Sequence, residues 1–348
     1  MRAKLSNLQS IPQVVAEMTL DEKLDMVGCY RACHTRPIPD MDVPAIYLMD
    51  GATGLNGTHV VLDYLTDPCR ADDPRTAYAT PEMVALNRVD LNEAAAKYKG
   101  DALMTDLVEQ AAKYRPGGRQ HISFPSGINI GASFDPITAE TIGRAVGQEL
   151  RDVGVDVCFG PNVDVARDPL GGRNYEMYGE DPELVAQTAA AFVRGMQSAG
   201  IAACAKHFLA NNQETNRNTN GGVITWANEQ AIREIYAKPY ELAVKEGNNS
   251  AFMTAFNRIG LSTCSTNYAL LELLTRGEWG FCGHNVTDYM DYPEYRYTNL
   301  MVRAGNELPL GGPNKLIGKG KGGNSSSTEG TWSAELNTVL VAADTASS

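Results

Sequence analysis

The sequence predicts an α/β protein built as a (β/α)8 barrel of the TIM type, either regular or short of one strand. Apolar runs rich in β-branched residues alternate with segments of helical period along most of the 348 residues, which is typical of repeated βα units around a parallel sheet. These runs end in polar or charged residues, and barrel proteins place their chemistry at such strand ends. A hydrophobic content of 43% also supplies enough apolar surface for one large core.

Seven segments are predicted as strands because they are short apolar runs bounded by turn-forming residues. In chain order they are residues 43–50, 121–131, 155–166, 201–208, 251–257, 281–288 and 304–310. Segments of helical period fill most of the gaps between them. This number of strands is close to that of a complete barrel.

Among the helices, the segment "DPELVAQTAAAFVRGMQSAG" is the best marked, with Asp181 as N-cap, Pro182 in the first turn and Gly200 as its stop. Its apolar positions recur at helical spacing and are predicted to face the core. They are Val185, Ala189, Phe192, Val193 and Met196. In a second helix, "ANEQAIREIYAKPYELAVKEG", Pro239 is predicted to cause a kink because it lacks a backbone donor.

Two regions fall outside the repeated pattern. Residues 58–120 separate the first two predicted strands by far more chain than a βα connection needs, and we expect a helical insertion there. Residues 317–348 begin with a Gly/Ser-rich stretch that is typical of a flexible linker and continue as a short tail. The predicted barrel domain is therefore residues 1–316, with the insertion inside it.

Composition excludes several classes of function. The chain carries 42 acidic and 30 basic residues without a basic tract, so nucleic acid is not an expected partner. Seven scattered cysteines without a close pair favour neither a metal site nor a redox motif, and their odd number favours a reducing compartment. Neither a signal-peptide core nor a membrane-spanning run is visible, which predicts a cytoplasmic protein without a membrane partner.

Polar side chains cluster after the predicted strands. The string "KHFLANNQETNR", residues 206–217, follows one strand directly, and ordinary loop composition would explain it alone. However, Asp50, Arg173 and Asp288 stand at comparable places after other strands. Such a set suits a polyhydroxylated ring, because hydroxyl groups both donate and accept hydrogen bonds. Cleavage of a glycosidic bond would then require a pair of carboxyl groups.

These segments resemble glycoside hydrolase family 3, and the resemblance covers most of residues 15–312. It rests on the motifs "MTLDEKLDMVG", "IPD" followed by "VPAIYLMDGATG", "FPSGINIGASFD", "GPNVDVARDPLGGRNYEMYGEDPELVAQTAAAFVRGMQSAGIAACAKHFLANNQETNR", "NEQAIREIYAKPYELAVK", "AFMTAFN" and "RGEWGFCGHNVTDY". The resemblance implies a retaining β-glycosidase, similar to β-glucosidases, that hydrolyses terminal non-reducing β-D-glycosyl residues. It implies a small carbohydrate substrate and no cofactor.

Residue by residue, the resemblance implies the following roles. Asp288 matches the nucleophile that forms the covalent glycosyl-enzyme. The residues that match those holding the hydroxyls of the first sugar are Asp50, Arg173, Lys206, His207 and Arg217. Met253 matches an apolar wall of the site. Phe256 and Tyr289 stand where the family usually has a tyrosine and a tryptophan, which affects the expected rate and sugar preference.

The general acid/base is the main departure from the family. In two-domain members it is a glutamate of an α/β sandwich domain, and no such domain is visible in this sequence. We therefore expect a sandwich domain or a second subunit to supply it, and this chain alone to act better on activated aryl glycosides. One alternative is a single-domain β-N-acetylglucosaminidase, although "KHFLANN" replaces the "KHFPGHG" loop of that branch. Another is a carbohydrate-binding barrel with little turnover.

Overall fold

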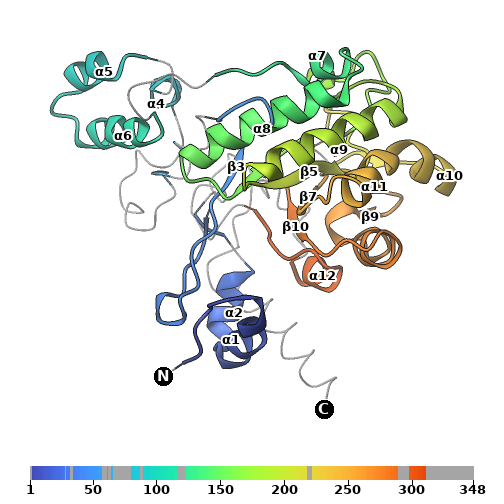
Figure 1. The fold of residues 1–348 in the computed structure, drawn as a ribbon, viewed down its shortest axis with the longest axis horizontal. Helices are drawn as coiled ribbons and strands as arrows, with labels where there is room; N and C mark the ends of the chain where they lie inside the picture. Colours follow the sequence, from blue (N-terminus) through green and yellow to red (C-terminus); the bar gives the residue numbers. More distant parts are fainter. Residues whose placement is uncertain are drawn as a thin grey trace.

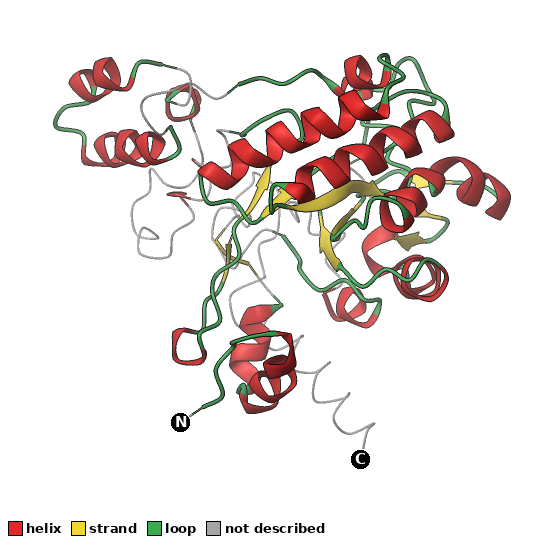
Figure 2. Cartoon of the chain, in the orientation of Figure 1, coloured by secondary structure: helices red, strands yellow, loops and turns green. Residues whose placement is uncertain are grey.

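The computed structural model describes residues 2–27, 29–31, 34–56, 61, 64–65, 80–86, 89–115, 122–217, 222–288 and 298–310. The predicted linker and tail, residues 317–348, lie outside these ranges. Helices and the central sheet of the described part are distinguished in Figure 2. No helix of the described part has the length and apolar character needed to cross a membrane.

A parallel sheet of five strands forms the centre of the described structure. Its order is β10-β7-β5-β4-β3, and the strands are β3 (Leu48–Asp50), β4 (Val157–Phe159), β5 (Ala202–Phe208), β7 (Ala251–Thr254) and β10 (His284–Thr287). Spatial neighbours follow one another along the chain, as in a barrel. Five of the predicted strand segments therefore contain a strand of this sheet. Closure into eight strands stays a prediction.

One other predicted strand is wrong, and the last one is reduced to a single bridge beside β10. Residues 122–126 form a loop that leads into helix α7 (Gly127–Gly131). The helix presses on a neighbouring segment: a Cβ atom at Gly127 would lie 2.0 Å from the carbonyl oxygen of Glu176. The small and apolar residues there serve a close helical contact and not a strand. In residues 304–310, only Leu308 makes a bridge, to Val286 of β10.

Helices α8 (Pro136–Asp152) and α9 (Pro182–Ser198) lie side by side over one face of the sheet, as Figure 1 shows in green. Glycine permits this approach, because a Cβ atom at Gly143 would lie 2.2 Å from the carbonyl oxygen of Phe192. The prediction for α9 is confirmed at its start, where the Asp181 side chain accepts a hydrogen bond from the backbone of Leu184. It is confirmed at its end by Gly200, whose φ is +89°.

The second predicted helix is divided at its proline. A π-helical turn, η7 (Ile232–Tyr236), precedes helix α11 (Lys238–Lys245), and Pro239 occupies the first turn of α11. At that position the missing backbone donor costs no intrahelical hydrogen bond. The predicted interruption is therefore present, as a change of helix type and a new helix start.

The helical insertion forms a unit with its own core. Helices α4 (Pro81–Ala85), α5 (Leu91–Lys97) and α6 (Ala102–Lys113) lie away from the sheet in Figure 1. Leu86 and Leu107 belong to an apolar cluster distinct from the main core. The prediction of helices in residues 58–120 holds for the part that the structure describes.

Smaller elements complete the described structure. At the amino-terminal end these are η1 (Leu8–Ser10), α1 (Ile11–Glu17), α2 (Leu20–Met26), η2 (Pro39–Met41) and the hairpin of β1 (Cys29–Arg31) and β2 (His34–Thr35). A small sheet contains β6 (Ile224–Thr225), β8 (Arg258–Ile259) and β9 (Ser262–Thr263). The remaining helices are η6 (Asn174–Glu176), α10 (Glu229–Ala231), η8 (Cys264–Thr266), η9 (Ala269–Glu278) and α12 (Thr298–Arg303).

Candidate active site

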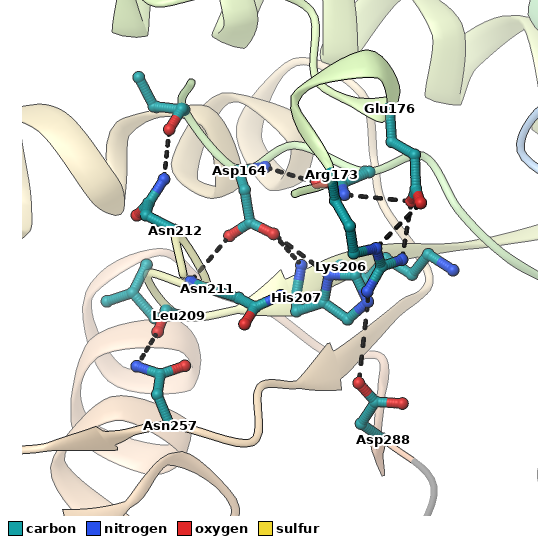
Figure 3. A network of polar contacts seen from close by, with 12 residues as sticks. Asp164, Arg173, Glu176, Lys206, His207, Leu209, Asn211, Asn212, Asn257 and Asp288 are labelled. Carbon is teal, nitrogen blue, oxygen red and sulfur yellow. Dashed lines mark hydrogen bonds and ion pairs between the residues drawn. The ribbon is translucent and has the colours of Figure 1, made fainter. Parts of the chain in front are cut away.

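Four predicted site residues lie together at the carboxyl end of the central sheet. Asp50 is the last residue of β3, Lys206 and His207 lie near the end of β5, and Asp288 follows β10. Because all these strands are parallel, their carboxyl ends face the same side of the sheet. Figure 3 shows Lys206, His207 and Asp288 gathered around the side chain of Arg173.

Lys206 and Asp50 form an ion pair at the carboxyl end of the sheet. Lys206 Nζ lies 2.6 Å from Asp50 Oδ1, and the side chains of Lys206 and Asp50 are 3% and 30% exposed. Burial opposes the charge on Lys206, but the Asp50 and Glu176 carboxylates together outweigh that effect and raise the pKa of the lysine above its ordinary value. The lysine is therefore a fixed cation in contact with a partly exposed carboxylate.

Arg173 is held in place by three of its nitrogens. Nε lies 2.9 Å from Glu176 Oε1 and Nη2 lies 2.7 Å from Glu176 Oε2, a bidentate pair. Its third nitrogen, Nη1, lies 3.1 Å from His207 Nε2. Burial would raise the pKa of Glu176, but the contact with Arg173 prevails and lowers it below the ordinary value. Glu176 is thus an ionised clamp for the guanidinium group.

His207 lies between two carboxylates. Its Nδ1 is 3.1 Å from Asp164 Oδ2, and its Nε2 is 3.8 Å from Asp288 Oδ2. Burial, followed by the nearby cations Arg173 and Lys206, holds the pKa of His207 well below its ordinary value. The ring is therefore neutral, and the Asp288 carboxylate faces it beside the Arg173 guanidinium.

An irregularity in β5 allows adjacent side chains to reach the same site. Successive side chains of a regular strand point to opposite faces of the sheet. The pairing of β5 with β7 shifts register between Lys206 and Phe208, and such irregularities re-aim side chains. Lys206 thereby contacts Asp50 on β3, while the neighbouring His207 ring contacts Arg173.

Arg217 joins the site through a carboxylate. Its Nη1 lies 2.9 Å from Glu214 Oε2, and Glu214 Oε1 lies 3.9 Å from Arg173 Nη1. The Arg217 guanidinium carbon is 4.8 Å from the ring centroid of Phe256. Asn211 Nδ2 donates to Glu214 Oε1 at 3.1 Å. Glu214 therefore links the two arginines, and Phe256 supports one of them by its aromatic face.

Of the two remaining predicted site residues, the structure describes Met253 but not Tyr289. Met253, on β7, is 2% exposed and belongs to an apolar cluster with Leu48, Phe159 and Val286. Met253 lies near the carboxyl end of β7 and presents an apolar surface to this cluster. Tyr289 lies outside the described residues.

Sequence reasoning missed two carboxylates of this network, Asp164 and Glu176. Asp164 is 2% exposed and lies in the largely apolar stretch after β4, two residues after the buried Asn162. A charged residue in such a stretch is a signal, because charged side chains are rarely buried unless they are partnered. Glu176 stands three residues after Arg173, which is a spacing that permits a local ion pair.

The arrangement can hold a polyhydroxylated ring and present a carboxylate to it. Lys206 and the arginines offer fixed positive donors, while Asp50 and Asp288 offer acceptors, and such groups complement hydroxyls. No cluster of three or more His, Cys, Asp or Glu side chains suited to a metal ion occurs among the described residues.

Known proteins match this chain over most of its length. The model of the glycosyl hydrolase family 3 N-terminal domain matches residues 103–299. β-Glucosidase B of Emericella nidulans is 32% identical over 305 residues, which cover 88% of this chain and 29% of that protein. Thermostable β-glucosidase B of Acetivibrio thermocellus is 30% identical over 279 residues, 80% of this chain and 30% of that protein.

Solved structures show the same similarity. β-Glucosidase 3B of Thermotoga neapolitana, in complex with glucose, matches with a TM-score of 0.67 and 27% identity, over 95% of this chain and 42% of that one. The β-glucosidase of Kluyveromyces marxianus, also in complex with glucose, matches with a TM-score of 0.67 and 26% identity, over 95% of this chain and 33% of that one. The chain therefore spans less than half the length of each of these relatives.

Proposed function

The chain belongs to glycosyl hydrolase family 3, and we propose that it is the nucleophile-bearing part of a retaining β-glucosidase. In this proposal, terminal non-reducing β-D-glucosyl residues are cleaved through a covalent ester on Asp288. The similar proteins are β-glucosidases, and two solved relatives hold glucose. We also infer that the five-stranded sheet belongs to a complete (β/α)8 barrel.

One observation carries the proposal. The Asp288 carboxylate lies at the carboxyl end of the sheet, 3.8 Å from His207 Nε2, and Arg173 Nη1 lies 3.1 Å from the same nitrogen. A nucleophilic carboxylate must be ionised, and nearby positive charge favours that form. Arg173 and Lys206 supply this charge from fixed positions.

The same cations suit the transition state. Their N–H groups can hold ring hydroxyls, and hydrogen bonds to sugar hydroxyls strengthen as the ring flattens toward an oxocarbenium ion. Asp50 adds an acceptor beside Lys206 at 2.6 Å. Together these side chains fix the sugar so that its anomeric carbon faces Asp288.

The general acid/base is proposed to come from outside the described residues. A retaining enzyme needs a second carboxyl group roughly 5 to 5.5 Å from the nucleophile. Glu176 is close to the site, but its pairing with Arg173 lowers its pKa, so it is a poor proton donor. The relatives are longer than this chain, and their additional length has room for such a group.

Kinetics with two substrates test this proposal. Residues 1–348 should hydrolyse a 4-nitrophenyl β-glucoside, whose leaving group departs without a proton. Cellobiose, whose leaving group needs one, should react more slowly by a further factor of about 10² to 10⁴. Comparable turnover of both substrates would place a general acid inside the chain and contradict this part of the proposal.

The nucleophile is tested separately by Asp288→Ala, with Asp152→Ala at the exposed end of α8 as the matched control. Loss of the nucleophile should reduce turnover of the aryl glucoside by about 10⁴-fold or more, whereas the control should retain it. Added azide should restore turnover in the Asp288 variant and yield the α-glucosyl azide, because a single displacement inverts the anomeric centre. A β-configured azide product, or full activity in the variant, would contradict the assignment.

A further inference from the structure

We propose that Asp164 is a positioning residue: its buried carboxylate fixes the His207 tautomer that carries its proton on Nδ1, so that Nε2 accepts from Arg173 and keeps that guanidinium beside Asp288. Its effect on catalysis rests on the proposed function, but the tautomer itself does not. In Figure 3 the Asp164 carboxylate and Asp288 lie on different sides of the His207 ring, and each faces a different ring nitrogen.

Asp164 is surrounded by donors. Its Oδ2 faces the backbone N–H and the Nδ1 of His207, each at 3.1 Å. Its Oδ1 faces the backbone N–H of Asn211 at 3.2 Å and the hydroxyl of Tyr240 at 3.1 Å. An ionised carboxylate has about four acceptor positions, and here all of them meet a donor. A proton on this carboxyl group would have to displace one of these four donors.

The opposite side of the ring gives the same answer independently. Arg173 has five N–H donors and no acceptor, so a hydrogen bond from Nη1 requires a lone pair on His207 Nε2. A neutral imidazole has one N–H and one lone pair, and the N–H must then be on Nδ1. There it faces Asp164 Oδ2. Both neighbours of the ring therefore select one tautomer.

The other protonation states do not fit these neighbours. With the proton on Nε2, two donors would face each other across 3.1 Å at Arg173, and a bare Nδ1 would face the Asp164 carboxylate. Unpaired buried polar groups of this kind cost about 1 to 3 kcal/mol each. Burial and neighbouring cations also disfavour the doubly protonated ring, since they lower the pKa of His207.

Asp164 also holds the turn that follows the histidine. One carboxylate accepts from the backbone of His207 and of Asn211, which flank the turn after β5. Tyr240, on α11, is fully buried and donates to the same carboxylate. Burial raises the pKa of Asp164 to about 7, against the lowering effect of the hydrogen bonds that it accepts. Through these contacts Asp164 connects the end of β5, the turn that follows it and helix α11.

Nitrogen-15 NMR tests the tautomer directly in the unaltered protein. The chain has 5 histidines, and His207→Gln identifies the signals of the ring in question. Protonated and bare ring nitrogens resonate far apart, and their couplings to the ring protons distinguish Nδ1–H from Nε2–H. We expect a neutral ring with Nδ1–H at about pH 8 and above, where Asp164, whose pKa burial raises to about 7, is ionised. Nε2–H, or a doubly protonated ring, would overturn the proposal whether or not the protein cleaves glucosides.

A double-mutant cycle tests the positioning effect. Asp164→Asn should lower kcat/KM for the aryl glucoside about 10- to 100-fold in the otherwise unaltered chain, because the ring and guanidinium lose their orientation. In a His207→Ala background the same substitution should have little further effect, because the group through which it acts is absent. An equal loss in both backgrounds would show a merely structural role and overturn the positioning role.

Tyr240→Phe is the matched control. It removes one donor from Asp164 Oδ1 and leaves the His207 contact on Oδ2 in place. We expect Nδ1–H to persist in this variant and kcat/KM to change less than threefold. If Asp164→Asn fails to fold, the tautomer in the unaltered chain and in Tyr240→Phe still decides the proposal. Conversion of the ring to Nε2–H by Tyr240→Phe would contradict control by the Oδ2 contact.

Discussion

Charged side chains lie at both ends of the central sheet, but the groups that they contact differ. At the amino end of β10, Glu307 accepts from the backbone N–H of Asn285 at 2.6 Å, and Arg276 pairs with Glu307 and donates to the backbone of Gly283 at 3.0 Å. At the carboxyl end, Arg173 and His207 contact mainly other side chains, and these come from different strands and loops. The amino-end network ties one strand to the segments beside it, whereas the carboxyl-end network brings side chains together.

Perturbed pKa values occur at both ends and do not separate them. Burial raises the pKa of Glu307, and burial followed by the charge of Arg276 lowers the pKa of His284 to about 4. At the other end, burial followed by nearby cations lowers the pKa of His207, and the contact with Arg173 lowers the pKa of Glu176 despite its burial. What distinguishes a candidate active site is therefore convergence from several strands, in agreement with the general division of barrels into a stabilising and a catalytic end.

The largest expected effect that would sharpen this comparison comes from Asp50. Asp50→Ala leaves the charge of Lys206 buried without its partner at 2.6 Å. We expect the free energy of unfolding to fall by about 2 to 4 kcal/mol, at or below the usual range for a broken buried pair because Asp50 is partly exposed. Turnover of the aryl glucoside by the folded fraction should also fall, by about 10²-fold, since the lysine loses its orientation. An unchanged free energy of unfolding in urea, together with an unchanged kcat/KM, would contradict this role of the ion pair.

At the carboxyl end of the sheet, the site residues that stand at strand termini could be predicted from the sequence. Asp50, Lys206 and Asp288 were predictable because each follows an apolar run directly, and parallel strands bring such termini together. The family resemblance added their roles, which stay proposals. Arg217 stands farther along the polar string after β5 and was assigned through the resemblance, and its contact with Glu214 is seen in the structure.

The rest could not be found from the pattern alone. Asp164 is separated from its partner His207 by 43 residues, and only folding brings them within 3.1 Å. The segment 121–131 was predicted as a strand because it is a short apolar run. Such a run does not distinguish a strand from a buried helical segment. Its glycines meet backbone carbonyls of a distant segment, a contact that has no local sequence signal.

A smaller effect is expected at the amino end, from Glu307→Gln. The amide keeps an acceptor for the backbone of Asn285 but loses the charge that pairs with Arg276. Stability should fall by about 1 to 2 kcal/mol, because these groups are only partly exposed. The kcat/KM of the folded protein should be unchanged. A selective loss of activity without loss of stability would break the division between the two ends.

The smallest effect concerns pH and Glu176. Its pKa in the folded protein is lowered below the ordinary value of 4.5, despite burial, by its contact with Arg173. Its contribution to stability is therefore complete above that value and is lost as the pH falls below it. Glu176→Gln should flatten the decline of the melting temperature between pH 5 and pH 3 relative to the unaltered protein. Parallel curves for the two proteins would contradict the role of this pair.

Trapping a covalent ester tests most directly whether Asp288 is the nucleophile of a retaining glycosidase. A 2-deoxy-2-fluoro-β-glucoside with a good leaving group should react, because fluorine destabilises the oxocarbenium-like transition states while the activated leaving group still departs. Peptide mapping by mass spectrometry should then find one fluoroglucosyl group on Asp288. A label on another residue, or unlabelled protein that nonetheless hydrolyses the nitrophenyl glucoside with retention, would contradict the assignment.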